Sequence, residues 1–297
     1  LNDSMFVEKS VRDTPQPMTA TDKQILQDRS LDYRVLNLAS NTFNENETSY
    51  YHKSIGGYHA AKLRRYQELI DAYISPEMQK AYSAIAQAQG DMTKVAGDSI
   101  YPVLNMLNTK YLILPLQGGQ TVPVLNTYAF GNAWFVGDIK YVDNANEELD
   151  GVGKINLRHQ AVADAKFKEA LGEAVPEDDM AIVKLTKYEP NELTYDISST
   201  KGGIVVFSEI YYPGWTATVD GEPVTVGRVD YVLRAINVKA GKHKVVLTFK
   251  PKSIRDTETV AYIAFALLFI AIIGGVWFEE RKKRKAATTD NEKASID

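Results

Sequence analysis

A run of nineteen residues without a charge lies near the carboxyl end of the chain, from Val260 to Phe278 (VAYIAFALLFIAIIGGVWF). Because a helix rises about 1.5 Å per residue, this run matches the hydrocarbon core of a bilayer, which is about 30 Å thick. Tyr262 and Trp277 lie near its two ends, where aromatic side chains commonly anchor a membrane helix. The alternative is a buried helix of a water-soluble protein, but such helices usually show a polar face. The run therefore predicts a transmembrane helix over residues 257–279.

The charges that flank this run predict its orientation. Five consecutive basic residues follow it, from Arg281 to Lys285, whereas the basic residues before it are diluted by Asp256 and Glu258. Positive charge close to a membrane helix is generally retained in the cytoplasm. We therefore expect residues 280–297 to form a basic cytoplasmic tail and residues 1–257 to lie outside the cytoplasm of a bacterial cell. Nucleic-acid binding by the basic run is the alternative, which a position beside the bilayer disfavours.

Composition limits the kinds of site and partner. The 297 residues allow one large domain or two ordinary ones, and a net charge of -4 argues against a nucleic-acid partner. The absence of cysteine excludes disulfides and thiolate metal sites, and the four histidines form no HxxxH or HExxH pair. We expect no metal site and no cofactor. Residues 1–30 contain no apolar signal-peptide core and begin at Leu1, so we expect a fragment of a longer protein that carries further membrane helices upstream.

The part before the apolar run has three sections, and the expected fold class is α+β. Residues 1–28 are polar and contain two prolines, which predicts a linker or extended arm. Residues 29–180 mix strand and helix patterns and predict an α/β lobe outside the cytoplasm. Residues 181–256 contain six short strand patterns, with a two-residue hairpin signal at Asp220-Gly221. Strands at this spacing without an intervening helix predict an antiparallel β-sandwich.

Within the lobe, periodicity predicts two helices one after the other. The first runs from Tyr58 to Ile74 and is opened by the Gly56-Gly57 pair, and the second runs from Pro76 to about Ala88 with Ser75 as its cap. A further helix is expected from Ala161 to Leu171. A short helix is predicted at 103–107, and strands are predicted at 33–38, at 110–114 and within 124–136.

Five blocks of the sequence carry a resemblance to a known family. They are SIGGYHAAKLRRYQELID (54–71), LNMLNTKYLIL (104–114), GNAWFV (131–136), VVFSEIYYPGWTATVDG (205–221) and YVLRAINVKAGKHKVVLTFKP (231–251). Together they resemble the carboxyl-terminal region of the YfhO family of bacterial membrane proteins. The blocks occur in the family's order, and the resemblance runs from about Tyr33 through the final helix.

The resemblance implies a multi-spanning relative of the GT-C glycosyltransferases, which take sugars from polyprenyl-phosphate donors outside the membrane. Some members are associated with glycosylating cell-envelope polymers. In that class the catalytic acidic residue lies in an early outer loop between the first helices, so the resemblance assigns no catalytic residue to this sequence. The implied partners are the lipid bilayer, a polyprenyl-phosphate sugar, an envelope polysaccharide and upstream transmembrane helices.

One cluster of candidate binding residues begins at the glycine pair. Backbone N–H groups at a glycine-rich helix start can approach an anion, and nearby basic side chains add complementary charge. The phosphate or pyrophosphate of a lipid-linked donor is a chemically reasonable ligand. The alternative is a tight turn before a solvated helix face, since the spacing is not that of a complete P-loop. The candidate binding residues are Gly56, Gly57, His59, Lys62, Arg64 and Arg65.

A second cluster is an aromatic-rich turn at the edge of the expected sandwich. Aromatic faces pack against the C–H patches of sugar rings, and acidic side chains accept hydrogen bonds from hydroxyl groups. The alternative is an ordinary Pro-Gly turn with the tryptophan in the core. A hydrolytic pair of Glu209 and Asp220 has no support, because nothing in the sequence defines their separation. The candidate sugar-binding residues are Glu209, Tyr211, Tyr212 and Trp215.

These observations together favour the outer portion of a membrane glycosyltransferase relative. We expect this portion to cap the membrane core and to help hold donor or acceptor, without catalysis of its own. The alternative is a non-enzymatic, membrane-anchored carbohydrate-binding or envelope assembly module. A soluble glycosidase is disfavoured by the apolar run and by the lack of a clear carboxylate motif.

Overall fold

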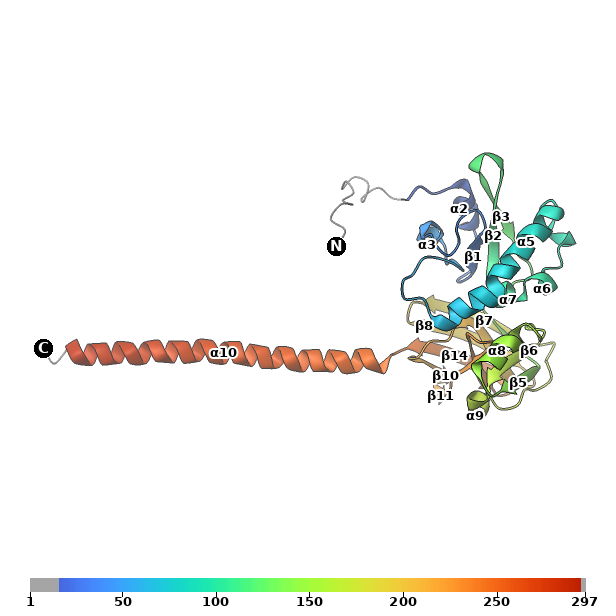
Figure 1. Cartoon of the computed structure of the whole chain (residues 1–297). Coiled ribbons are helices and arrows are strands. Elements are labelled where there is room, and N and C mark those ends of the chain that lie inside the picture. The colour runs from blue at the N-terminus through green and yellow to red at the C-terminus, as the bar shows by residue number, and fades with distance from the viewer. Residues whose placement is uncertain (1–15, 295–297) are drawn as a thin grey trace. The chain divides into compact units, whose positions relative to one another are not determined.

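The computed structural model describes residues 16–294, apart from the side chains of residues 252, 254, 255 and 284–294. The chain divides into two compact units, Leu1–Thr248 and Phe249–Asp297. The first holds the sheets and the short helices, and the second consists mainly of one long helix (Figure 1). The predicted fold class, α+β with one apolar helix at the carboxyl end, is confirmed.

Two antiparallel sheets pack face to face as a β-sandwich in the first unit. Tyr195 and Phe207, one from each sheet, meet edge to face in the shared core with 4.9 Å between ring centroids. One sheet has the order β11 (Glu222–Val224), β10 (Trp215–Val219), β14 (Gly241–Phe249), β8 (Glu192–Ser199), β7 (Ile182–Glu189). The other has the order β12 (Gly227–Val229), β13 (Leu233–Val238), β9 (Gly203–Ile210), β4 (Ala133–Val136).

The hairpin predicted at Asp220-Gly221 connects β10 to β11. Asp220 has a φ of 54° and Gly221 a φ of 90°, and two positive φ values are what a two-residue hairpin of this kind requires. The six strands predicted after residue 180 are all present, whereas β11 and β12 were not predicted. Each of these two has only three residues, which is too short for a periodic signal.

Strand β9 joins the sandwich to the rest of the first unit, because both of its faces are buried. Val205 and Phe207 face the core between the sheets, whereas Ile204 and Val206 face a second core. Strand β4 pairs with β9, although it comes from the section predicted as a separate lobe. The predicted boundary between 29–180 and 181–256 therefore does not separate two units, and this part of the domain prediction is corrected.

Two smaller sheets complete the first unit. In one, β1 (Arg34–Asn37) runs parallel to β2 (Thr109–Pro115), and β2 pairs antiparallel with β3 (Thr121–Leu125). In the other, β5 (Asp138–Val142) and β6 (Gln160–Asp164) are parallel and helix α8 (Ala145–Val152) connects them. The strands predicted at 33–38 and 110–114 are confirmed as β1 and β2.

The helix predicted from Ala161 to Leu171 is present only in its second half. The first half belongs to β6, and the helical part consists of η4 (Ala165–Phe167) and α9 (Lys168–Leu171). Ala161, Val162 and Ala163 are completely buried and pair with β5. Packing and strand pairing therefore outweigh the high helix propensity of alanine at these positions.

The two consecutive helices predicted around Pro76 form one continuous helical rod. It begins at α4 (Arg64–Leu69), continues through the π-helical turn η1 (Ile70–Ile74) and ends with α5 (Ser75–Gln87). The Ser75 N–H donates to the Ile70 carbonyl, five residues earlier, so Ser75 is not a helix cap. Proline lacks an N–H and its ring clashes with the carbonyl four residues before it in a regular helix. The wider π turn accommodates the proline without ending the helix.

Part of the section predicted as a linker or extended arm, residues 1–28, is folded. Helix α2 (Ala20–Ile25) begins at a capping box made with Thr19, and it buries Ile25 completely. The prediction is wrong for this helix, while residues 1–15 lie outside the described residues. Among the described residues of the first unit, the remaining short helices are α3 (Glu47–Tyr51), η2 (Met92–Lys94), α6 (Gly97–Ile100), α7 (Pro102–Met106) and η3 (Gln117–Gly119).

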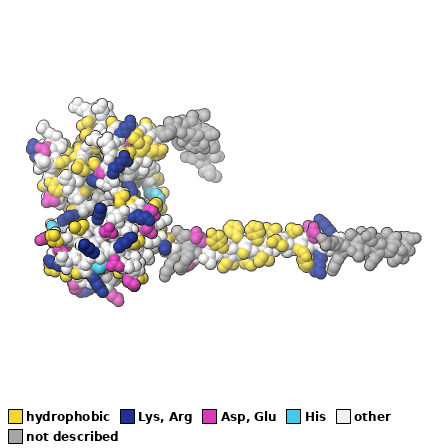
Figure 2. All heavy atoms as spheres, turned by 180° about the vertical axis from the view of Figure 1, so that it is seen from behind, with side chains coloured by type: hydrophobic (Ala, Val, Ile, Leu, Met, Phe, Trp, Pro, Cys, Tyr) yellow, Lys and Arg dark blue, Asp and Glu magenta, His cyan; other side chains and the backbone are white. Residues whose placement is uncertain are grey.

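The second unit contains α10 (Lys252–Ala294), a helix of 43 residues. Its segment Asp256–Lys283 is long and apolar enough to cross a membrane, and none of its most apolar stretch is buried by protein. Figure 2 shows the apolar side chains as a continuous band that ends at acidic and basic side chains. An exposed apolar surface of this extent is typical of a membrane-associated segment. The predicted span 257–279 lies within it.

Candidate functional site

A cleft of about 280 Å³ in the first unit brings together residues from both clusters identified in the sequence. Arg64 and Arg65 come from α4, and Tyr211 and Tyr212 come from the turn that follows β9. We call this cleft the arginine–tyrosine pocket. Its lining holds three arginines, four tyrosines and no acidic residue; these seven are Arg64, Arg65, Arg228, Tyr66, Tyr211, Tyr212 and Tyr231.

The first turn of α4 presents its two arginines in different environments. Arg64 is 91% exposed, and its Nε donates to Glu68 at 2.9 Å. Arg65 is 30% exposed, and its guanidinium lies 4.4 Å from the centre of the Tyr231 ring. The Tyr231 hydroxyl in turn donates to Glu68, which accordingly bonds both Arg64 and Tyr231. Burial raises the pKa of Tyr231 to about 12, so its hydroxyl stays protonated at neutral pH.

A single buried carboxylate holds two of the pocket's arginines. Glu148 on α8 is completely buried and accepts hydrogen bonds from Arg65 Nη1 at 3.0 Å and from Arg228 Nη2 at 2.8 Å. Asp164 lies 3.8 Å from the same Arg228 group. These acids lie behind the arginines, so the wall of the pocket carries guanidinium groups and no carboxylate. Fixed guanidinium groups are preorganised for planar, bidentate contact with an anion.

The turn between β12 and β13 places Tyr231 in the pocket. Asp230 and Tyr231 both have positive φ values, 49° and 70°, which are uncommon for residues other than glycine, Asn or Asp. Asp230 ties this turn to β6, since its N–H donates to the Val162 carbonyl at 2.7 Å and its Oδ1 accepts from the Val162 N–H at 3.0 Å. Burial raises the pKa of Asp230 to about 8, and the negative charge of Glu148 adds to the shift.

The glycine pair has a different role from the one predicted. The helix starts at Arg64, and the Gly56 and Gly57 N–H groups already donate to Ser54 Oγ at 3.0 Å and to the Thr42 carbonyl at 2.7 Å. A Cβ atom on Gly56 would lie 1.9 Å from the Thr42 carbonyl oxygen, so the close approach of two backbones requires glycine here. The predicted anion site at a glycine-rich helix start is thus corrected.

Two further residues of the first cluster also lie outside the pocket lining. His59 is exposed, and its ring Nδ1 accepts a hydrogen bond from the Ala61 N–H at 3.0 Å. Lys62 places its ammonium group 5.2 Å from the centre of the Phe43 ring. Of the first cluster, only Arg64 and Arg65 reach the pocket.

The second cluster is divided in a similar way. Tyr211 and Tyr212 line the pocket, whereas Glu209 and Trp215 do not. Glu209 lies 3.4 Å from the Arg34 guanidinium, and the Trp215 ring lies 3.9 Å from the Arg234 guanidinium. Burial lowers the pKa of Arg234 to about 10. These contacts make Glu209 and Trp215 parts of a largely buried ionic network.

Sequence reasoning missed the residues that support the pocket from below, above all Glu148 and Asp230. Neither lies in a recognisable motif, and both act on residues more than sixty positions away in the chain. The only available signal in the sequence was an acidic residue, Glu148, at a position on the apolar side of a helix. Among the described residues, no group of three or more His, Asp or Glu side chains is arranged to hold a metal ion.

Comparison with known families found a match in the carboxyl-terminal half of the chain. Residues 151–261 match the family model described as Bacterial membrane protein YfhO. We call residues 151–261, which are similar to this family, the YfhO segment. The comparison with curated proteins and the comparison with solved structures found no match. The YfhO match and the exposed apolar helix α10 together indicate association with a membrane.

The YfhO segment contains only part of the arginine–tyrosine pocket. Arg228, Tyr231 and the two tyrosines after β9 lie inside the matched residues. Arg64 and Arg65 lie outside them, as does Glu148. The YfhO segment therefore supplies one wall of the pocket, and α4 with α8 supplies the other wall and its support.

Proposed function

We propose that this chain is the extracytoplasmic portion of a multi-spanning membrane protein resembling the GT-C glycosyltransferases. We further propose that its arginine–tyrosine pocket holds the phosphate group of a lipid-linked sugar, while the segment caps a membrane-embedded core. The YfhO match and the apolar helix support the membrane setting, and the basic run after that helix supports the outer location of the first unit. The single observation that carries the pocket's role is the convergence of three guanidinium groups and four phenol rings in one cleft.

The chemistry of the pocket suits a phosphate attached to an apolar or sugar group. Guanidinium groups match phosphate oxygens in a planar, bidentate arrangement, and Glu148 holds Arg65 and Arg228 in place before a ligand arrives. Tyrosine faces and the apolar side chains of Leu63 and Ile210 offer surface for sugar C–H groups or isoprenoid carbons. A volume of about 280 Å³ is near the lower end for ligand sites, which fits a head group better than an entire lipid.

Binding of an isoprenoid phosphate tests this proposal. The purified chain in nanodiscs of zwitterionic lipid is titrated with farnesyl phosphate and, separately, with farnesol. We expect farnesyl phosphate to bind at least about tenfold more tightly, because charge-assisted hydrogen bonds contribute about 1.5–3 kcal/mol. Equal affinity for the phosphate and the alcohol would remove the proposed role.

Two matched substitutions locate the binding to the pocket. Arg64→Gln and Lys62→Gln each remove one positive charge from the same segment, but only Arg64 lines the pocket. Arg64→Gln is expected to weaken farnesyl phosphate binding by about tenfold and Lys62→Gln much less. Arg65→Lys keeps the charge but loses the fork of donors, and it is also expected to weaken binding. Equal effects of Arg64→Gln and Lys62→Gln would indicate diffuse attraction rather than a site.

A further inference from the structure

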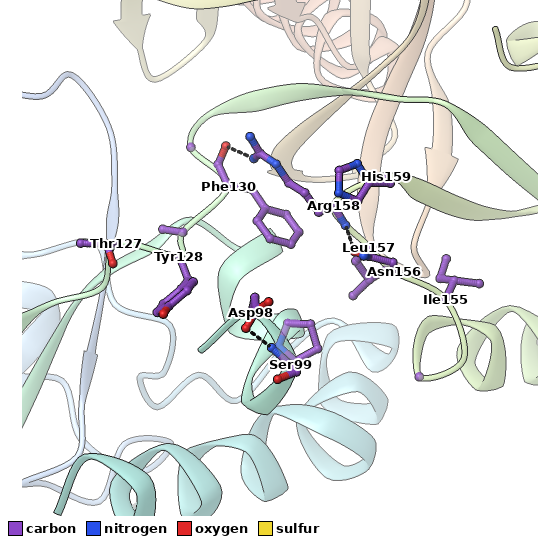
Figure 3. A pocket seen from close by; sticks show the side chains of 14 residues that line it. Asp98, Ser99, Thr127, Tyr128, Phe130, Ile155, Asn156, Leu157, Arg158 and His159 are labelled. Atoms are coloured by element: carbon purple, nitrogen blue, oxygen red, sulfur yellow. Dashed lines mark hydrogen bonds between the residues drawn. The ribbon is translucent and has the colours of Figure 1, made fainter. Parts of the chain in front are cut away.

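A second cavity of the first unit, with a volume of about 720 Å³, shares no lining residue with the arginine–tyrosine pocket. Three segments form its walls: α6, the loop between β3 and β4, and the loop that follows α8. Figure 3 shows the rings of Tyr128 and Phe130 on one side of the open space, Asp98 and Ser99 on another, and Asn156 beside Leu157 and Arg158 on a third. The cavity thus combines aromatic rings with planar polar side chains.

A neighbouring cavity has a volume of about 450 Å³. Phe130, Arg158 and His159 line both, so these three residues mark the junction. The neighbouring cavity is bounded by Trp134 on β4 and by Glu177 before β7. The two cavities adjoin at these residues, and we call the pair the Phe130 groove. Two adjoining cavities suit a linear chain of repeating units better than a compact molecule.

The ring of Phe130 is held in a defined orientation at the junction. It meets Trp134 edge to face with 5.0 Å between ring centroids, and the Arg158 guanidinium lies 5.3 Å from its centre. Arg158 Nη1 also donates to the Phe130 carbonyl at 3.1 Å, which uses one of the five donors of the guanidinium. The remaining donors of Arg158 are thus positioned at the point where the two cavities join, and Phe130 lines both.

The charged side chains along the groove are mainly acidic, which argues against attraction of an anionic polymer. Arg158 is opposed by Asp98 in the first cavity and by Glu177 and Asp178 in the second. The His159 ring lies against Glu177, with 2.8 Å between Nδ1 and Oε1. A polyphosphate or nucleic acid would need an excess of basic side chains. Aromatic faces with carboxylate, amide and guanidinium groups instead suit the C–H faces and hydroxyl groups of uncharged sugars.

We propose that the Phe130 groove binds a linear, uncharged oligosaccharide. Phe130 and Tyr128 stack against sugar rings, and Asp98, Asn156 and Arg158 form hydrogen bonds with hydroxyl groups. The proposal is independent of phosphate binding in the arginine–tyrosine pocket, because the two sites have no residue in common. The competing occupant is an extended peptide added to the edge strand β4, which would use the second cavity but not Asp98 or Tyr128 in the first.

Dependence of affinity on chain length tests the proposal. The complete chain is placed in nanodiscs, without alkyl maltoside or glucoside detergents, because their sugar head groups would compete. Neutral oligomers of glucose and of N-acetylglucosamine, from disaccharide to hexasaccharide, are titrated by calorimetry and by saturation-transfer NMR. We expect affinity to rise by at least about tenfold with length and then to level off when the groove is filled. Absence of binding by both series, or affinity independent of length, overturns the proposal.

Substitutions in the groove separate the sugar from the peptide. Tyr128→Ala and Asp98→Asn are each expected to weaken oligosaccharide binding by about fivefold or more, the effect of losing one stacking or hydrogen-bonding contact. Asp71→Asn is the matched control, since Asp71 is exposed and lines neither cavity. These positions are preferable to Phe130, whose contact with Trp134 also supports the fold. Unchanged affinity in both variants, or binding of extended peptides with no competition from sugars, overturns the assignment.

Discussion

Asp230 is a carboxylic acid enclosed completely by protein, and it directs the turn that carries Tyr231 into the arginine–tyrosine pocket. Its Oδ1 accepts a hydrogen bond from Val162, whereas its Oδ2 is buried with no hydrogen-bond partner among the described residues. Burial raises its pKa to about 8, so the folded protein keeps this side chain protonated at neutral pH. In the unfolded chain the same group titrates near its ordinary value of 3.8.

The raised pKa predicts a specific pH dependence of stability. Between about pH 4 and pH 8 the folded state binds one more proton than the unfolded state, so this stabilisation is complete at low pH and is lost as the pH rises through about 8. The slope is on the order of 1 kcal/mol per pH unit. Asp230→Asn keeps the Oδ1 acceptor and removes the titration, and we expect it to unfold at a higher temperature than the native chain at about pH 8 but not at about pH 5.

Thermal unfolding followed by tryptophan fluorescence measures this difference. Asp150→Asn serves as the control, because the Asp150 side chain is 71% exposed. The difference in melting temperature between Asp230→Asn and the native chain should grow with pH, while that of the control stays constant. A constant difference for Asp230→Asn would show that the buried carboxyl does not titrate in this range.

At the scale of elements, strands with a two-residue hydrophobic period could be predicted from the sequence. Elements whose structure depends on tertiary packing could not. The sandwich strands alternate between a buried and an exposed face or run continuously apolar, so local sequence is enough to recognise them. By contrast, β6 was mistaken for a helix because its alanines favour helices, and only its pairing with β5 makes it a strand. The π turn before Pro76 was missed because proline and a preceding serine usually mark a helix start.

Substitutions in helix α2 test whether this segment is a packed helix or an extended arm. Ile25 is completely buried beside Val35 and Ile113, and the Thr21 hydroxyl donates to the Thr121 carbonyl at 2.9 Å. Ile25→Ala is expected to lower the free energy of unfolding by about 2–4 kcal/mol, the usual effect of deleting a buried aliphatic side chain. Lys23→Ala in the same helix is exposed and should change it by less than about 0.5 kcal/mol. Denaturant unfolding distinguishes a docked helix from an arm, for which both substitutions would be equally neutral.

At the scale of the whole molecule, the proposed orientation depends on the apolar segment of α10 and the basic run that follows it. The chain contains no cysteine, so a single introduced cysteine reports accessibility without background. In intact cells that carry the protein in their membrane, we expect Lys201→Cys in the first unit to react with a membrane-impermeant maleimide. Ala287→Cys, after the basic run, should react only when the membrane is permeabilised, because the positive charge is retained inside.

The same two variants also define the results that would contradict this orientation. Labelling of Ala287→Cys in intact cells, together with protection of Lys201→Cys, would reverse the orientation and withdraw the extracytoplasmic role. Equal labelling of both before and after permeabilisation would show that α10 does not separate them by a membrane. Replacing the five basic residues from Arg281 to Lys285 with glutamine is expected to weaken the orientation preference.

Local sequence by itself determined the apolar helix, the six sandwich strands predicted after residue 180, the hairpin at Asp220-Gly221 and the family resemblance. Each depends on neighbouring residues, through an uncharged run, a two-residue period or a turn that needs positive φ. Only the tertiary structure decided which candidate residues share a site. Arg65 and Tyr231 are far apart in sequence, and they meet because buried Glu148 and Asp230 hold the helix and the turn that carry them. Such partners are selected by long-range packing, which leaves no periodic or motif signal in the chain.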